Sequence, residues 1–425
     1  MITIMDKPHS EENVKGILEP LVKKWFFSKY KQFSLPQLYG VKEVHNKSNI
    51  LVSAVTGSGK TVTAFLSILN ELVRLSKEKK LEDRVYAVYI SPLKALNADI
   101  HVNLEIPLKE MRDLAKADRW ELGIRTGVRT GDTSIAERQK MLRKPPHIMI
   151  TTPESLALML SSYKFRDLLK GVQWCIIDEI HSLAENKRGV HLSLSLEHLQ
   201  HLSPSMARVG LSATVAPVEE VAKYLAGYEE GKERPCKIAQ VEFTKKFDLQ
   251  VISPVEDLIN VSHGMMHKKL YSTLDKLIDE HKTTLIFTNT RAGTERVVHH
   301  LKTMYPSKYI ENIGAHHGSL SKTHRKKIEE SLRNGELKVV VTSTSLELGI
   351  DIGYIDLVIC LSSPKSVARL LQRTGRAGHA LHETVKGRIV VLDRDDLIEC
   401  SVMLKNALEK KIDKIRIPTN CLDIL

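Results

Sequence analysis

The most constraining feature of this chain is a series of short runs rich in valine, isoleucine and leucine, each followed by a stretch with helical periodicity. Ten such runs are found in two sets, residues 49–54, 85–92, 147–153, 174–179 and 208–214, then 283–290, 312–318, 338–344, 356–363 and 388–393. Nearly continuous apolar runs are typical of parallel strands that are buried on both faces. With helices between them, they predict an α/β fold with one doubly wound parallel sheet in each half.

A mixed, charged segment interrupted by prolines, residues 227–258, separates the two sets of runs. We place the domain junction near residue 243, which gives a first domain over 1–242 and a second over 243–400. Residues 401–425 form a tail that ends on apolar residues. We expect that the tail either docks on the second domain or begins a further domain.

Composition excludes several classes of protein. Hydrophobic residues make up 42% of the 425 residues and charged residues 27%, as in a soluble globular protein. No apolar run is long enough to span a membrane, and the N-terminus lacks a secretory signal, so we expect a cytoplasmic protein. The five cysteines are scattered without the spacing of a zinc or iron–sulfur site, and Cys175 and Cys360 lie in apolar runs typical of buried structural thiols.

The formal net charge of +12 favours contact with a polyanion such as nucleic acid. A generally solvated basic surface explains the same charge equally well. Charge alone therefore leaves the partner open, and the motifs must decide.

The stretch "AVTGSGKT", residues 54–61, has the form of a phosphate-binding loop between a strand and a helix. Gly57 and Gly59 allow backbone N–H groups to turn toward phosphate oxygens, Lys60 can reach the β- and γ-phosphates, and the hydroxyl of Thr61 can hold Mg²⁺. The first position of the usual pattern is Ala54, not glycine, and the alternative is an ordinary glycine-containing turn. We predict that the loop binds nucleotide through Thr56, Gly57, Ser58, Gly59, Lys60 and Thr61.

Two carboxylates follow the apolar run in "WCIIDEIHSL". Asp178 and Glu179 then lie at the carboxyl end of a strand, where one can hold Mg²⁺ and the other can orient or deprotonate water. We assign the metal to Asp178 and the base to Glu179; alone, the pair would read as a solvated acidic loop. The sequence lacks the guanine-reading N-K-x-D motif that a GTPase needs, and a small-molecule kinase needs no second sheet that carries arginines.

The motifs "AVTGSGKT", "DEIH", "SAT", "TSTSLELGIDIG" and "QRTGRAGH" occur in an order that resembles superfamily 2 nucleic-acid helicases. The stretches "YISPLKALNADI", "RTGDTS", "TTPESL" and "KRGVHLSLSLEHL" are similar to the large helicase-related (Lhr) family. The resemblance runs from about Gln37 to Asp396. It implies two tandem RecA-like domains, with ATP and Mg²⁺ as cofactors and ATP bound between the domains.

In the first domain the resemblance assigns adenine recognition to Gln37, with Phe33 as a possible neighbour. It assigns hydrolysis to Lys60, Thr61, Asp178 and Glu179. The coupling of hydrolysis to the second domain is assigned to a further set, His181, Ser212, Ala213 and Thr214.

In the second domain, Arg373 and Arg376 match residues that face the γ-phosphate, with Gln372 nearby. An arginine that stabilises the transferred phosphoryl group is worth about 10³ to 10⁵ in rate where such residues have been measured. Gly349 and Asp351 match residues that sense the nucleotide.

The resemblance also implies loops that hold a phosphate backbone without reading its sequence. The matching residues are Pro92, Lys94, Arg129, Thr130, Gly131, Thr152, Pro153 and Glu154 in the first domain, and Asn289, Arg291, His316, His317 and Thr342 in the second. For the two adjacent histidines we prefer backbone contact or packing to metal binding, because no carboxylate or cysteine near them in the sequence completes a ligand set.

The function implied is a monomeric ATP-driven helicase or translocase on single-stranded or partly duplex DNA or RNA, moving 3′ to 5′. Two alternatives stay open: a strand-annealing or remodelling factor that does not need hydrolysis, and a nucleic-acid-binding module with a decayed motor. Substitution of Glu179 distinguishes a helicase or translocase from an annealing factor, because annealing should survive the substitution and translocation should not.

Two departures from the family pattern bear on unwinding. The residues between "GIDIG" and "QRTGRAGH" leave no room for the long β-hairpin that related processive helicases use as a wedge. The end of the chain, "IRIPTNCLDIL", resembles the lead-in to a winged-helix domain. We therefore expect the motor core of a longer protein, or a natural short version, with competent ATPase and weak unwinding.

Overall fold

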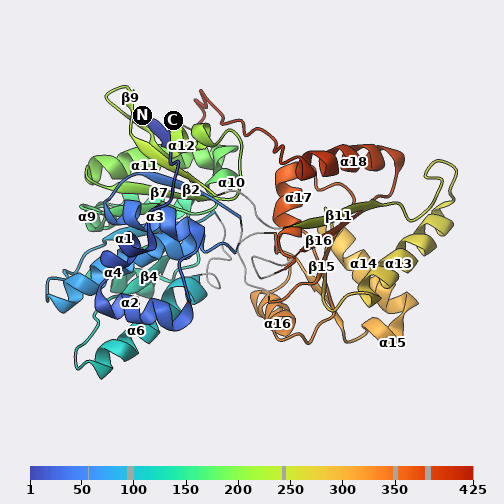
Figure 1. Cartoon of the computed structure of the whole chain (residues 1–425), viewed down its shortest axis with the longest axis horizontal. Coiled ribbons are helices and arrows are strands. Elements are labelled where there is room, and N and C mark those ends of the chain that lie inside the picture. The colour runs from blue at the N-terminus through green and yellow to red at the C-terminus, as the bar shows by residue number, and fades with distance from the viewer. Residues whose placement is uncertain (56, 93–99, 242–245, 348–352, 379–383, 425) are drawn as a thin grey trace. The chain divides into compact units, whose positions relative to one another are not determined.

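The computed structural model describes residues 1–55, 57–92, 100–241, 246–347, 353–378 and 384–424. Contacts divide the chain into two compact units. The first unit contains Met1–Glu242 together with Lys414–Leu425, and the second contains Phe243–Asp413 (Figure 1).

The first unit is built on one parallel sheet with the strand order β1-β10-β2-β7-β6-β3-β5-β4. The bounds of these strands, in chain order, are β1 Ile2–Ile4, β2 Ile50–Ser53, β3 Ala87–Ile90, β4 Thr126–Arg129, β5 Ile148–Thr151, β6 Trp174–Ile177, β7 Ala207–Ser212 and β10 Cys236–Gln240. The short strands β8 (Tyr228–Glu229) and β9 (Lys232–Glu233) form a separate antiparallel hairpin.

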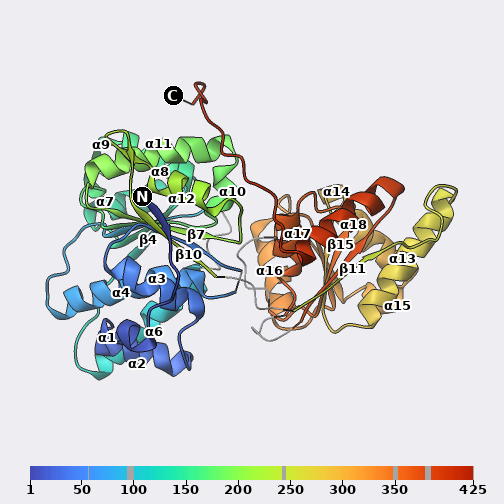
Figure 2. The same ribbon diagram turned by 45° about the horizontal axis from the view of Figure 1, so that its top comes forward.

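Helices cover both faces of this sheet (Figure 2). One face carries α1 Glu11–Gly16, α2 Pro20–Lys29, α3 Leu35–His45, α4 Lys60–Lys77, the π-helix η1 His101–Glu105 and α6 Ile106–Ala117. The remaining helices are α7 Ile135–Arg143, α8 Pro153–Ser161, α9 Tyr163–Leu168, α10 Ile180–Ala184, α11 Lys187–Leu202 and α12 Val218–Ala226. Two apolar clusters result, one on each face: α4 contributes Phe65 to the first, and α11 contributes Leu196 to the second.

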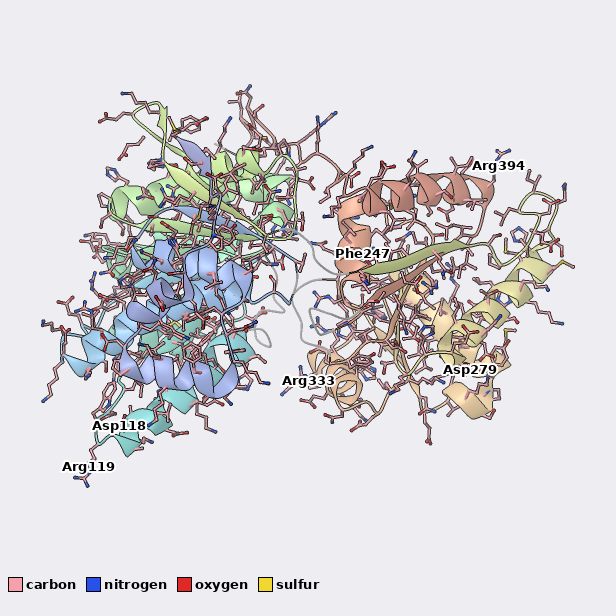
Figure 3. All side chains as sticks on the ribbon, viewed as in Figure 1. Asp118, Arg119, Phe247, Asp279, Arg333 and Arg394 are labelled. Atoms are coloured by element: carbon pink, nitrogen blue, oxygen red, sulfur yellow. The ribbon has the colours of Figure 1, made fainter. Side chains whose placement is uncertain are left out.

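The second unit has a parallel sheet with the order β11-β16-β15-β12-β14-β13. Its strands are β11 Phe247–Ile252, β12 Thr284–Phe287, β13 Ile313–His316, β14 Val339–Thr342, β15 Leu357–Leu361 and β16 Val385–Val390. Its helices are α13 His263–Asp279, α14 Arg291–Met304, α15 Pro306–Tyr309, α16 Lys322–Arg333, α17 Val367–Thr374 and α18 Arg394–Leu408. In Figure 3 the labels Phe247 and Arg394 mark where β11 and α18 begin, and Asp279 and Arg333 mark where α13 and α16 end.

The two parallel sheets confirm the predicted fold class, and each of the ten predicted runs overlaps a strand. We interpreted the segment 227–258 as a junction between the two sets of strands. The structure shows that it also contains four strands, β8 to β11. β10 and β11 alternate polar with apolar residues, unlike the buried central strands, so their sequence lacks the continuous apolar signal.

The tail also differs from the expectation that it docks on the second domain. Residues up to Leu408 continue α18 of the second unit, but the residues from Lys414 group with the first unit. The backbone N–H of Ile415 donates to the carbonyl of Ala216 at 2.6 Å, and the Ile415 side chain packs against the first unit's core. Lys187 and Asp423 form an ion pair at 2.5 Å.

Across the part of the chain that the structure describes, we find no helix that combines the length and the apolar character needed to cross a membrane.

Candidate nucleotide site and nucleic-acid loops

The loop that connects β2 to α4 has the backbone conformation of a phosphate cradle. Gly57 and Gly59 have φ angles of +79° and +89°, which L side chains rarely adopt. Gly59 is the residue that precedes α4, a helix of 18 residues, so the free N–H groups of its first turn face the loop. The sequence therefore folds here as the motif predicts.

Lys60 is buried at the base of this loop, with 7% of its surface exposed. Its Nζ donates to the carbonyl of Ala54 at 2.5 Å and to that of Val55 at 3.0 Å. The ammonium group therefore lies inside the loop, where it can bind a phosphate oxygen that the same loop holds.

Gln37 lies against the cradle. Its Oε1 accepts from the backbone N–H of Ser34 at 2.8 Å, which closes the start of α3. A Cβ atom added to Gly59 would lie 3.0 Å from Gln37 Nε2, so the amide is next to the phosphate loop. Phe33 is different: it is buried and stacked on Phe26 at 4.6 Å, which makes it a core residue and not a partner for a base.

Asp178 and Glu179 follow β6, as predicted. The hydroxyl of Tyr89, at the end of neighbouring β3, donates to Asp178 Oδ2, and the backbone N–H of Glu179 donates to Asp178 Oδ1 at 2.9 Å. Burial and the negative charge of Glu179 raise the pKa of Asp178 to about 6, although Tyr89 and Lys60 act in the opposite direction. Tyr89 is a site residue that the sequence analysis missed, because an aromatic residue in a buried strand reads as core.

Glu179 has a left-handed backbone, with φ of +48°, and only 9% of its surface is exposed. Its Oε2 atom is buried, and no residue in the part of the chain that the structure describes makes a hydrogen bond to it. A buried carboxylate oxygen with no donor is costly unless a ligand or water serves it, so this atom is consistent with a proton acceptor for a bound water.

These residues fit magnesium and a nucleoside triphosphate. The candidate ligands are oxygens, which Mg²⁺ prefers: the carboxylates of Asp178 and Glu179, and the hydroxyl of Thr61, which follows Lys60 at the start of α4. The glycines leave the loop backbone accessible to phosphate, and Lys60 supplies a cation.

His181 connects the acidic pair to the segment Ser212–Thr214. Its Nδ1 lies 3.2 Å from the Ser212 hydroxyl and accepts from the backbone N–H of Ala213, also at 3.2 Å. Its Nε2 lies 3.5 Å from Glu179 Oε2. Burial, with the charge of Lys60, lowers the pKa of His181 to about 4, so the ring is neutral at pH 7. Thr214 follows this cluster and is partly exposed.

The first unit's predicted nucleic-acid residues lie at strand ends and in the loops that follow them. Arg129, at the end of β4, is 6% exposed and donates to the carbonyl of Thr130 at 2.6 Å, so it supports the loop more than it projects from it. Burial and nearby Arg138 lower its pKa. Gly131 is exposed, Thr152 caps α8, and Pro153 is the first residue of that helix.

Arg188, at the start of α11, is a second residue that the sequence analysis missed. Its Nε pairs with Glu154 Oε1 at 2.6 Å, and its Nη2 donates to the carbonyl of Pro92 at 2.9 Å. It therefore ties two predicted nucleic-acid loops together. The basic start of "KRGVHL" was the signal, but its contacts are with residues far away in the sequence.

In the second unit, the two predicted arginines have different surroundings. Arg373 is 2% exposed and lies over the Phe287 ring, so it faces the interior of the unit, whereas the prediction had it facing a phosphate. Arg376 is partly exposed, and its Nη2 donates to the carbonyl of Glu347 at 3.1 Å. Gln372 is partly exposed on α17, the helix that also carries Arg373.

Other predicted residues of the second unit lie near the ends of β12, β13 and β14. Asn289 Nδ2 donates to the carbonyl of Ser363 at 3.0 Å, and Arg291 is exposed and donates to the Ser319 hydroxyl at 2.7 Å. Thr342 is fully buried.

The adjacent histidines have separate carboxylate partners, which the sequence analysis did not foresee. His316 Nε2 lies 2.9 Å from Glu329, and His317 Nε2 lies 2.6 Å from Glu295. Among the described residues, no group of three or more histidine, cysteine, aspartate or glutamate side chains has the arrangement of a metal site. Four predicted residues lie outside the described residues, Thr56, Lys94, Gly349 and Asp351.

Two family models match the chain. A DEAD/DEAH box helicase model matches residues 34–221, and a helicase conserved C-terminal domain model matches residues 268–380. The matched ranges contain the cradle and acidic pair in the first unit and α17 in the second.

Curated relatives match the whole length of this chain. The ATP-dependent helicase Lhr-Core of Methanothermobacter thermautotrophicus is 56% identical over 426 residues, covering 100% of this chain and 49% of that protein. The ATP-dependent helicase Lhr-Core protein 2 of Thermococcus barophilus is 54% identical over 427 residues, with coverage of 100% and 49%. The chain thus spans about half the length of the curated relatives it matches.

A solved structure, the Mycobacterium smegmatis helicase Lhr bound to ssDNA and AMP-PNP, superimposes with a TM-score of 0.86 at 38% identity. The match covers 97% of this chain and 52% of that chain. The chain belongs to the superfamily 2 DNA and RNA helicases, has two tandem RecA-like domains, and is most like the motor core of the large helicase-related (Lhr) family.

Proposed function

We propose that this chain hydrolyses ATP to move along single-stranded nucleic acid and to unwind or remodel duplexes. One observation carries the proposal: a continuous set of contacts runs from Asp178 and Glu179 through His181 to Ser212 and Ala213. The related M. smegmatis Lhr structure, bound to ssDNA and a nucleotide analogue, supports the same assignment.

The cradle would bind the phosphates of ATP through the N–H groups around Gly57 and Gly59 and through Lys60. Thr61 and Asp178 would hold Mg²⁺, which when bound neutralises charge on the β- and γ-phosphates. We assign the adenine side of the nucleotide to Gln37, and the position of its amide next to Gly59 supports this assignment.

Glu179 acts on the attacking water. Among the described residues no hydrogen bond is made to its buried Oε2, although His181 Nε2 lies 3.5 Å away, and this oxygen can therefore accept a proton from a water placed beside the γ-phosphate. General base catalysis of this kind contributes about 10² to 10⁴ in rate.

Negative charge that develops on the phosphoryl group needs a cation, and we assign this role to Arg376. Arg376 belongs to the second unit, while the cradle belongs to the first. Hydrolysis then depends on both units. A step along the strand follows if the grip of the nucleic-acid loops changes between the ATP-bound and product-bound states.

Strand displacement tests this proposal. Duplexes of about 15 base pairs with a 3′ or a 5′ single-stranded overhang are incubated with the protein and Mg-ATP, beside a Glu179→Gln variant. We expect ATP-dependent displacement from the 3′-overhang substrate by the wild-type chain only. Displacement only from the 5′-overhang substrate would show that the chain moves 5′ to 3′ instead.

The same experiment separates the alternative of an annealing factor, which the net charge of +12 permits. Annealing of complementary strands that is equal in the wild type and in Glu179→Gln, without any displacement, would show that hydrolysis is not the main activity. Because the chain has no long hairpin insertion, we also expect weak unwinding. Efficient unwinding of duplexes several times longer would contradict that expectation.

A further inference from the structure

Arg373 is held in the interior of the second unit from several sides. Its guanidinium lies 5.2 Å from the centre of the Phe287 ring, at the end of β12. Its Nη1 lies 3.5 Å from Asn289 Oδ1, and its Nη2 lies 3.5 Å from Glu347 Oε2. An arginine that is 2% exposed and enclosed in this way cannot turn to a phosphate without breaking these contacts.

Glu347, in the loop after β14, is the buried anion that balances this cation. It is 6% exposed, so both charges of the pair are largely withdrawn from water. Its other carboxylate oxygen lies 3.9 Å from Nε of Arg369, one turn earlier on α17, which is more exposed. A buried carboxylate and guanidinium stabilise each other, and the loss of one leaves the other as an unpaired buried charge.

The backbone of Glu347 contacts the next arginine. Its carbonyl accepts a hydrogen bond from Nη2 of Arg376 at 3.1 Å. One residue thus fixes Arg373 with its carboxylate and Arg376 with its carbonyl. Because the Glu347 side chain helps to anchor its own backbone, this hydrogen bond links Arg376 to the Glu347–Arg373 pair.

We propose that Glu347 is a positioning residue for hydrolysis: it pairs with Arg373, which serves as an anchor, and so holds Arg376 in the orientation that hydrolysis requires. The proposal rests on the proposed ATPase function. It gives Arg373, in α17, a structural role and Arg376, two residues after the end of α17, a phosphate-binding role.

The first test is Glu347→Gln, which keeps the size and the backbone carbonyl but removes the charge. The measured quantities are kcat and KM for ATP in the presence of single-stranded DNA, and the Kd for a fluorescent ADP analogue. We expect kcat to fall about 10- to 100-fold, in the range for loss of one aligned charge-stabilising group. The Kd for the analogue should change by less than about twofold, because the cradle lies in the first unit.

Asp248→Asn provides the matched control. Asp248 pairs with Arg388, another mostly buried arginine of the second unit, at 2.8 Å and away from α17. Loss of the Asp248–Arg388 pair should leave kcat within about twofold of the wild-type value. Equal losses of kcat in both variants would show a general structural effect and overturn the proposal.

A double-mutant comparison tests the link to Arg376. If Glu347 acts through Arg376, the variant that combines Glu347→Gln with Arg376→Ala should be no slower than Arg376→Ala alone. If the double variant lost kcat by the product of the two single losses, Glu347 and Arg376 would act independently, and the proposal would be overturned.

Glu347→Asp keeps the test decisive if Glu347→Gln does not fold. This variant retains the charge on a shorter side chain, so a folded protein should show an intermediate kcat with unchanged analogue binding. A wild-type kcat in either folded variant would overturn the proposal. A wild-type chain without strand-stimulated ATPase would instead refute the proposed function itself.

Discussion

The backbone N–H of Ala213 donates a hydrogen bond to Nδ1 of His181 at 3.2 Å. Because a backbone N–H can only donate, Nδ1 must carry a lone pair, and the neutral ring therefore holds its proton on Nε2. That nitrogen lies 3.5 Å from Glu179 Oε2. His181 thus links the Glu179 carboxylate to the backbone of Ala213.

Replacement of His181 by alanine should uncouple hydrolysis from strand binding. We expect the stimulation of ATPase by single-stranded DNA to fall at least about fivefold, because the contact between Glu179 and the Ser212–Thr214 segment is lost, while nucleotide binding stays near normal. The measurement is the ratio of hydrolysis rates with and without the strand. His198→Ala, an exposed histidine on α11, is the control, and retained stimulation in His181→Ala would refute this coupling role.

Gly59→Ala should abolish tight ATP binding. The residue has φ of +89°, and an added Cβ would approach both Gln37 Nε2 and Ser34 Oγ at 3.0 Å. The added methyl group would therefore strain the loop and push on the side chains of Gln37 and Ser34. We expect the Kd of a fluorescent ATP analogue to rise at least about 50-fold. Gly264→Ala, where nothing lies within 4 Å of the new Cβ, should leave the Kd unchanged; wild-type affinity in Gly59→Ala would be incompatible with this geometry.

The sequence predicted the cradle and the acidic pair because both depend on local order. A strand, a glycine loop and a helix follow one another over residues 50–77, and Asp178 comes directly after β6. Parallel strands then bring their carboxyl ends to one edge of the sheet. The short-range sequence pattern was therefore sufficient to predict where these residues lie in the fold.

The sequence could not predict contacts made by residues from distant elements. Tyr89 and Asp178 are 89 positions apart, and Arg188 and Pro92 are 96 apart, so only the folded sheet brings them together. The burial of Arg373 was likewise hidden, because its anion, Glu347, lies in a loop 26 residues earlier. β10 and β11 were missed because their polar residues broke the apolar pattern.

Tyr89→Phe should weaken the use of Mg²⁺. The hydroxyl stabilises the ionised form of Asp178, whose pKa burial and Glu179 already raise to about 6, so its removal favours protonation. Stacking of the ring on Phe65, at 5.1 Å, needs no hydroxyl and should persist. We expect the Mg²⁺ concentration for half-maximal ATPase to rise about three- to tenfold at pH 7, with smaller effects at pH 8.5. An unchanged Mg²⁺ dependence would count against this role.

His147 should make the stability of the first unit depend on pH. It is 0% exposed, and burial followed by the charge of Arg125 lowers its pKa to about 4, against about 6.5 when unfolded. The unfolded chain therefore binds a proton that the folded chain rejects as the pH falls below 6.5. Stability is full above pH 6.5 and is lost on the way to pH 4, by about 2 kcal/mol at pH 5.

The check is urea unfolding of the wild type and of His147→Asn at pH 7 and pH 5. All three tryptophans, Trp25, Trp120 and Trp174, lie in the first unit, so their fluorescence reports on that unit. An asparagine can still accept the backbone N–H of Arg125, which His147 Nδ1 accepts at 3.0 Å. The wild type should lose about 2 kcal/mol more than the variant between these pH values; equal losses would show that His147 does not titrate as described.

The central claim is that a strand of nucleic acid controls hydrolysis at Glu179. The most direct measurement is the rate of ATP hydrolysis with no strand, with single-stranded DNA and with single-stranded RNA, for the wild type and for Glu179→Gln. We predict strong stimulation of the wild type by at least one strand and a rate about 10² to 10⁴ lower in the variant, which should still bind ATP. A wild-type rate indifferent to both strands, or a Glu179→Gln variant that hydrolyses ATP normally, would contradict the account.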